Sequence, residues 1–173
     1  MVAAIEWLGA ASFEHALYPA GPGATVLARA LERANERMTP VVFADAPALR
    51  DGEALPDIVK RPTAVDPELT TGPSPQNIRT RPFADPNPAL RTWAAERCTR
   101  HPITAMTAPV TLDRYWDEPR NASVVWCKRS ANPPAAHQRH TCEWLKRRWH
   151  ELYTGRYPMQ SEPATLARLI AEG

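Results

Sequence analysis

Glycine is scarce in this chain of 173 residues, which has seven glycines against nineteen prolines. The proline share is about twice the usual one. Many of the prolines lie between Pro56 and Pro109, so this stretch cannot form a continuous helix or the interior of a sheet. The sequence also lacks any run close to the roughly 18 apolar residues of a membrane span. Its start shows no basic segment followed by an apolar block, so we expect neither a membrane partner nor a signal peptide.

Cysteine and excess charge are scarce as well. The three cysteines, Cys98, Cys127 and Cys142, show no C-x-x-C spacing. This usage fits a reducing, cytoplasmic location and argues against a disulfide scaffold or a zinc site. The net charge of +2, from 21 basic and 19 acidic residues, gives no electrostatic reason to expect nucleic acid as a partner. We expect no cofactor and no bound metal.

What remains is a composition typical of a soluble globular protein, with 43% hydrophobic and 23% charged residues. The length suits a single domain over residues 1–173. Within it we distinguish a strand–turn–helix–strand unit at 1–45, a proline-rich lid-like segment at 46–115, and C-terminal strands and helices at 116–173.

Apolar periodicity predicts the helices and strands. The expected helices are 2–13, 24–37, 88–98, 134–148 and a terminal helix capped by Ser161 with Leu166, Leu169 and Ile170 pointing inward. The expected strands are 16–18, 40–44, 122–127 and 149–153, with a tight turn at 19–23. Strand 40–44 is apolar throughout, as in a strand buried on both faces. The alternation of strands and helices predicts an α/β fold with a mostly parallel sheet.

Four stretches together resemble the α/β-hydrolase superfamily, and its small esterase branch of methylesterases and hydroxynitrile lyases above all. They are Arg37–Leu55, Arg97–Pro109, Ala122–Pro134 and Leu152–Pro163. The last, LYTGRYPMQSEP, is the most specific, because the family commonly has Thr-Gly-His-x-Pro-Met-x-Ser-x-Pro there. The resemblance covers nearly the whole chain but only the second half of the family's fold. It implies a partial α/β-hydrolase fold with a proline-rich lid, without the family's first four strands and its oxyanion loop.

The resemblance also assigns the position of the family's nucleophile. The family places a serine on a sharp turn between a strand and a helix, in the pattern G-x-S-x-G. Here that turn falls on residues 19–23, where Gly21 has no nucleophilic side chain and Pro22 lacks a backbone N–H. Residues 10–14 offer another turn that keeps a serine, Ser12, but it lacks both glycines and lies in the first predicted helix.

The family's acid and base positions are substituted too. The acid position matches Ser130, or Arg129 if the alignment slips by one residue. Asp45 could serve instead, because some members place the acid after the sixth strand; we favour reading Asp45 as a carboxylate that caps a loop. The histidine of Thr-Gly-His is replaced by Arg156, and an arginine stays protonated at neutral pH.

Other residues could in principle rebuild a site, namely His15, His101, His137, His140 and His150. His137 and His140 share one helix face with Cys142 nearby, which could suggest a metal. No carboxylate stands at a useful spacing, so we favour two histidines that face solvent. Cys127 is expected to be an inert core thiol, and the basic run 146–148 a solvated helix end.

Three hypotheses follow. The one we favour is a truncated and catalytically degraded protein of the α/β-hydrolase fold. A start at Met1 within a family helix agrees with it. The second is an active hydrolase with a non-standard site or one completed by another chain. The third is a non-enzymatic binding or scaffold protein. The resemblance implies a small apolar ester or ligand, and the missing strands imply a homodimer or a complementing chain, because an exposed apolar strand edge invites pairing.

Overall fold

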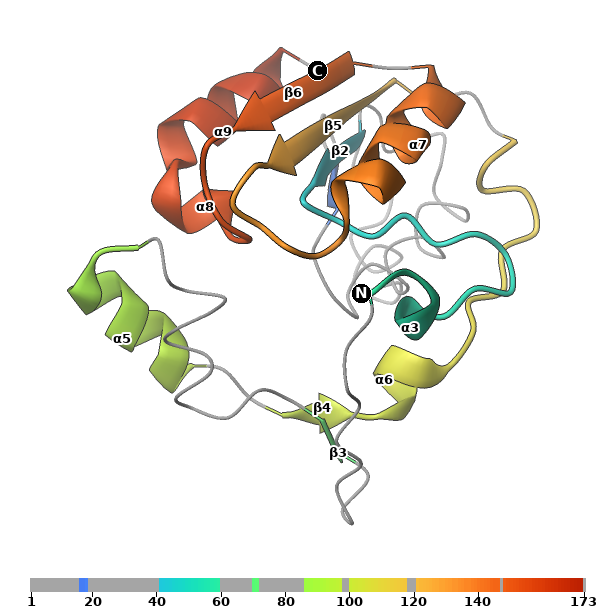
Figure 1. The fold of residues 1–173 in the computed structure, drawn as a ribbon, viewed down its shortest axis with the longest axis horizontal. Coiled ribbons are helices and arrows are strands. Elements are labelled where there is room, and N and C mark those ends of the chain that lie inside the picture. The colour runs from blue at the N-terminus through green and yellow to red at the C-terminus, as the bar shows by residue number, and fades with distance from the viewer. Residues whose placement is uncertain are drawn as a thin grey trace, which may run out of the picture.

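The centre of the fold is a four-stranded sheet in which every pairing is parallel (Figure 1). The computed structural model describes residues 16–18, 41–59, 70–71, 86–97, 100–117, 121–146 and 148–172. The strands are β1 (Ala16–Tyr18), β2 (Val41–Ala44), β5 (Ala122–Cys127) and β6 (Arg148–Leu152), in the order β1-β2-β5-β6. The predicted α/β class and parallel sheet are confirmed.

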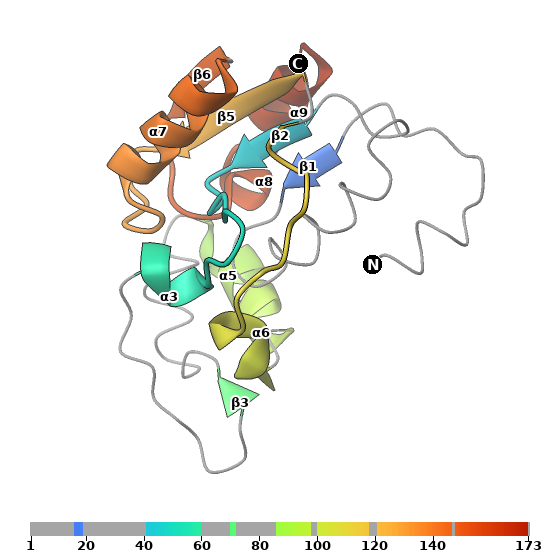
Figure 2. The same cartoon turned by 90° about the vertical axis from the view of Figure 1, so that its right-hand side faces the viewer.

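Helices cover both faces of this sheet (Figure 2). On one face lies α7 (Ala135–Leu145), and on the other lies α9 (Pro163–Ala171). Successive strand residues point to opposite faces, so β2 contributes Val41 and Phe43 to the core under α7, and Val42 and Ala44 to the core under α9. All four residues of β2 are buried, as predicted for a strand covered on both sides.

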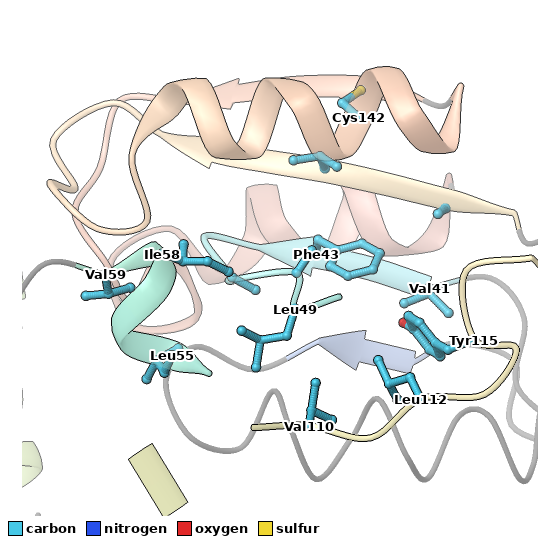
Figure 3. Packing of buried hydrophobic residues seen from close by; sticks show 14 residues of the cluster. Val41, Phe43, Leu49, Leu55, Ile58, Val59, Val110, Leu112, Tyr115 and Cys142 are labelled. Carbon is cyan, nitrogen blue, oxygen red and sulfur yellow. The ribbon is translucent and has the colours of Figure 1, made fainter. Parts of the chain in front are cut away.

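The larger core lies on the α7 side and includes the chain that follows β2 (Figure 3). Leu49 and Leu55 pack there with Val110, Leu112 and Tyr115. A carboxylate and an indole hold this chain in place: Asp51 Oδ1 accepts from the Leu112 N–H at 2.8 Å, and Trp116 Nε1 donates to the Leu49 carbonyl at 2.9 Å. The segment after β2 is therefore part of the core rather than a detached loop.

The proline-rich region contains more regular structure than the sequence predicts. Besides α5 (Pro88–Glu96), it holds the short helices α3 (Leu55–Ile58) and α6 (Thr104–Thr107) and a small antiparallel pair, β3 (Thr70–Thr71) with β4 (His101–Pro102). α5 begins as predicted, because the Asn87 side chain accepts from the Leu90 N–H at 2.9 Å. No helix within the described ranges has both the length and the apolar character needed to cross a bilayer.

Several predicted boundaries are wrong. The strand expected at 149–153 is shifted by one residue, to Arg148–Leu152, and the helix expected at 88–98 ends at Glu96. The helix expected over 134–148 ends at Leu145, because Lys146 adopts a left-handed conformation with φ of 52° that ends the helix, and Arg148 already belongs to β6. Ser161 does not cap the terminal helix; it ends the short helix α8 (Pro158–Ser161), and Glu162 precedes α9.

The remaining predictions are either confirmed or lie outside the described residues. The strand at 122–127 and the burial of Leu166 and Leu169 are confirmed. The expected elements at 2–13, 19–23 and 24–37 lie outside the described residues.

The packing under α7 predicts the effect of truncating one aromatic side chain. Phe43 is 1% exposed and its ring lies 6.3 Å from that of Trp116. Phe43→Ala should lower the free energy of unfolding by about 3–5 kcal/mol. Tyr153→Ala is the matched control, since Tyr153 is 77% exposed and its loss should cost under about 0.5 kcal/mol. Urea unfolding measures both, and equal costs would contradict this view of the core.

Candidate functional site

Three polar side chains meet where three parallel strands end. Asp45 directly follows β2, Ser130 lies in the turn after β5, and Arg156 lies in the loop after β6. Because the strands are parallel, their carboxyl ends share one edge of the sheet, above α5 and α8 in Figure 1. In open α/β sheets, ligands bind at this edge.

Asp45 is the centre of the cluster and is fully buried. Its N–H donates to the Val125 carbonyl at 2.9 Å, which extends the pairing of β2 with β5 by one step. Its φ of 48° then turns the chain out of the strand. An aspartate tolerates this left-handed conformation better than most side chains. The sequence favours Asp45 as a carboxylate that caps a loop. The structure places this carboxylate inside the protein, where it accepts from the Cys127 N–H and from Ser130 in the turn after β5.

The carboxylate is held by neutral donors from β5 and α7. Ser130 Oγ donates to Asp45 Oδ2 at 2.6 Å, and Gln138 Nε2 donates to Asp45 Oδ1 at 3.1 Å. The Cys127 N–H also donates to this carboxylate. The turn that presents Ser130 is closed by its own N–H, which donates to the Cys127 carbonyl at 2.9 Å.

Arg156 supplies the positive charge of the cluster. Its Nη1 lies 4.0 Å from Asp45 Oδ2, and its side chain is 12% exposed. The same Nη1 donates to the Asn132 carbonyl in the β5–α7 connection. Backbone hydrogen bonds from Lys128 to Leu152 and from Arg129 to Thr154 join the ends of β5 and β6, and so bring the loop of Arg156 beside that of Ser130.

Burial decides the charge state of this cluster. It raises the pKa of Asp45 from 3.8 to about 6, since a carboxylate removed from water is poorly solvated. The Ser130 hydroxyl, the Arg156 charge, the Gln138 amide and the Cys127 N–H each lower this pKa, but together they do not offset the desolvation. Asp45 therefore changes charge about one unit below neutral pH.

The structure thus brings together Ser130, Arg156 and Asp45, three of the residues that sequence analysis singled out. Ser12 and Gly21, the two positions considered for a nucleophile, lie outside the described residues. Gln138 and Asn132 were missed. Gln138 shares a helix face with Cys142 four residues later, and a polar residue on that buried face was the available signal.

The histidines do not join the cluster in the part of the chain that the structure describes. His137 is half-buried and its Nε2 accepts from the Ala48 N–H at 3.1 Å, so the expectation that it faces solvent is wrong. Burial lowers the pKa of His137. His140 is exposed and pairs with Arg50. Among the described residues, no group of three or more His, Cys, Asp or Glu side chains is placed to hold a metal ion.

The raised pKa of Asp45 predicts a specific pH dependence of stability. The folded state binds the Asp45 proton more tightly than the unfolded state does. The contribution of this proton to the free energy of unfolding is therefore complete below pH 3.8, and it is lost as pH rises through about 6. The loss amounts to roughly 3 kcal/mol. Asp45→Asn cannot titrate and should lack this fall, which urea unfolding between pH 4 and 7.5 would measure. The exposed Asp113→Asn is the control; a parallel pH profile of wild type and Asp45→Asn would contradict the prediction.

This chain is similar to known proteins in its structure and not detectably in its sequence. No family model matches this sequence. No curated protein matches it either. Solved structures do match. An extracellular α/β-hydrolase from a Paenibacillus species is similar over 99% of this chain and 75% of its own, with 17% identity and a TM-score of 0.77. That hydrolase shares structural and functional homology with tobacco salicylic acid binding protein 2.

Two further structures agree with this result. A polyneuridine aldehyde esterase is similar over 98% of this chain and 76% of its own, with 15% identity and a TM-score of 0.70. A variant of tomato methylketone synthase I, in complex with beta-ketoheptanoate, is similar over 98% of this chain and 74% of its own, with 12% identity and a TM-score of 0.73. Likeness at this level of identity concerns the fold. This chain therefore has the α/β-hydrolase fold.

Proposed function

We propose that this chain is a catalytically degraded member of the ester hydrolases with this fold and does not perform Ser–His–Asp ester hydrolysis. One observation carries the proposal: the loop after β6 brings Arg156 to the cluster, where the resemblance expects the histidine. A hydrolase needs a base that takes the serine proton and returns it to the leaving group. A guanidinium stays protonated at neutral pH and cannot take that proton.

The surroundings of Asp45 support the same proposal. In a triad the acid accepts an N–H from the histidine and so orients it. Here the carboxylate accepts from Ser130, Gln138 and the Cys127 N–H. None of the described histidines is bonded to Asp45 or Ser130, and the pKa of Asp45 is raised rather than lowered.

One contact favours a second candidate, a hydrolase with a non-standard site. The 2.6 Å hydrogen bond from Ser130 Oγ to Asp45 Oδ2 could let Asp45 act as a base. Ser130 Oγ would attack the ester carbonyl as its proton passes to Asp45. Asp45 would return the proton to the departing alkoxide, and water would then hydrolyse the acyl-Ser130 ester. A carboxylate with a pKa of about 6 is a weak base for a hydroxyl, so we place this candidate second.

Location and partners are part of the proposal. A cytoplasmic location is supported by the burial of Cys127 and Cys142 within the core. A homodimer or a complementing chain is supported by the sheet order β1-β2-β5-β6, because an unpaired strand at the end of a sheet is a template for pairing with another chain. The mass of the chain in solution, by light scattering, would distinguish one copy from two.

Ester hydrolysis by the full chain tests the proposal. With p-nitrophenyl acetate as substrate, the wild type should release p-nitrophenol no faster than the Ser130→Ala and Asp45→Asn variants, within about twofold of a heat-denatured sample. Circular dichroism would first show that each chain is folded. Arg168→Gln, at an exposed residue of α9, controls for hydrolysis by surface groups.

The contrary outcome is equally clear. Saturable hydrolysis by the wild type that falls at least about 100-fold in Ser130→Ala, as removal of a nucleophile demands, would overturn the proposal in favour of the second candidate. Saturable hydrolysis unaffected by Ser130→Ala and Asp45→Asn would overturn both, and would place the chemistry outside this cluster.

A further inference from the structure

The hydrogen bonds around Asp45 and Arg156 are unevenly distributed. Both oxygens of Asp45 accept side-chain hydrogen bonds, from Ser130 and Gln138. The guanidinium has five N–H donors, and among the described residues only Nη1 is engaged, by the Asn132 carbonyl. The Nη1 of Arg156 and Oδ2 of Asp45 are 4.0 Å apart, which is an ion pair without a hydrogen bond. The carboxylate is well satisfied, and the cation is not.

A guanidinium with unused N–H donors is suited to bind a ligand that presents two oxygens. Its N–H groups form a planar fork that matches a carboxylate, and such bidentate hydrogen bonds between charged groups are among the strongest in proteins. At 12% exposure the Arg156 side chain is largely desolvated yet still open to solvent. It also stands at the carboxyl edge of the sheet, where α/β folds bind ligands.

We propose that Arg156 binds the carboxylate of a small organic acid at this edge of the sheet, and that Asp45 controls the affinity. This inference rests on the proposed function, in which Arg156 takes no part in proton transfer. Tyr157, the next residue in this loop, packs against Ala94 of α5. Because the Arg156 side chain is only 12% exposed, a small acid can reach it more readily than a large one.

Asp45 acts by competing with the ligand for the same positive charge. When Asp45 is ionised, it neutralises part of the Arg156 charge and repels an incoming carboxylate. When it is protonated, the guanidinium is left as the one uncompensated charge of the cluster. The other groups of the cluster are neutral: the side chains of Ser130 and Gln138 and the backbone carbonyl of Asn132. Among the described residues, Arg156 is the only one whose charge shifts the pKa of Asp45. Affinity for a carboxylate should therefore rise as pH falls through the pKa of Asp45.

Calorimetric titration of the full chain with acetate tests this proposal, with acetamide as a ligand of the same shape and no charge. At pH 5.5 we expect acetate to bind with a Kd of about 1–10 mM, and acetamide not to bind. Acetate is mostly ionised at both pH 5.5 and pH 7.5. A rise of about threefold or more in the Kd for acetate at pH 7.5 would therefore reflect the ionisation of Asp45.

Variants separate the binding role of Arg156 from the effect of Asp45 on affinity. Arg156→Gln should lose acetate binding, and Arg156→Lys should weaken it about tenfold, because a single ammonium cannot form the fork. Asp45→Asn should bind at pH 7.5 at least as tightly as the wild type does at pH 5.5, without pH dependence. Arg168→Gln, the same change at an exposed arginine, should behave as the wild type.

Three results would overturn the inference. They are acetate binding that survives in Arg156→Gln, acetamide binding as tight as that of acetate, or no binding by either the folded wild type or Asp45→Asn. These outcomes are independent of ester turnover. Hydrolysis with Arg156-dependent acetate binding would contradict the proposed function alone, and no hydrolysis with no acetate binding would contradict this inference alone.

Discussion

The burial of one carboxylate constrains the arrangement of this whole edge of the sheet. Asp45 has no access to solvent, and a buried carboxylate without partners would cost several kcal/mol. Its partners come from three other places in the chain: the turn after β5, the second turn of α7 and the loop after β6. Moving the turn after β5 or α7 would remove a hydrogen bond to Asp45, and moving the loop after β6 would remove the nearby positive charge. The carboxylate therefore couples β2, β5, β6 and α7 at the point where a ligand would approach.

Under the proposed function, this coupling would let a hydrolase-like framework persist without hydrolase chemistry. A triad needs a nucleophile, a base that takes its proton and an acid that orients the base, each within hydrogen-bond distance of the next. In this chain the carboxyl edge of the sheet carries a hydroxyl, a carboxylate and a guanidinium. The guanidinium has no lone pair with which to take a proton. Fixed charge and hydrogen-bond donors remain, and under the proposals above these would bind a ligand rather than transfer a proton.

Sequence patterns predict those parts of the fold that depend on local hydrophobicity. The strand at 122–127 and the fully buried strand β2 follow from short apolar runs rich in β-branched residues. The early end of α7 at Leu145 could not be predicted, because Lys146 carries no helix-ending signal such as glycine at the left-handed position. The contacts of Gln138 with Asp45 join residues 93 positions apart. Such contacts are created by the sheet register, which no local pattern contains.

The balance of charge and burial also separates this cluster from ion pairs elsewhere in the chain. At the protein surface, Lys128 Nζ, just after β5, lies 2.6 Å from Oε2 of Glu151 on β6, and this contact lowers the pKa of Glu151. Asp45 also has a cation nearby, at 4.0 Å, yet its pKa is raised. The difference is solvent: an exposed carboxylate keeps its hydration when it gains a partner, whereas Asp45 has lost hydration and gained a cation beyond hydrogen-bond distance. The same incomplete compensation leaves Arg156 with donors to spare, so an anion bound to Arg156 would replace the negative charge that Asp45 loses when it takes up a proton.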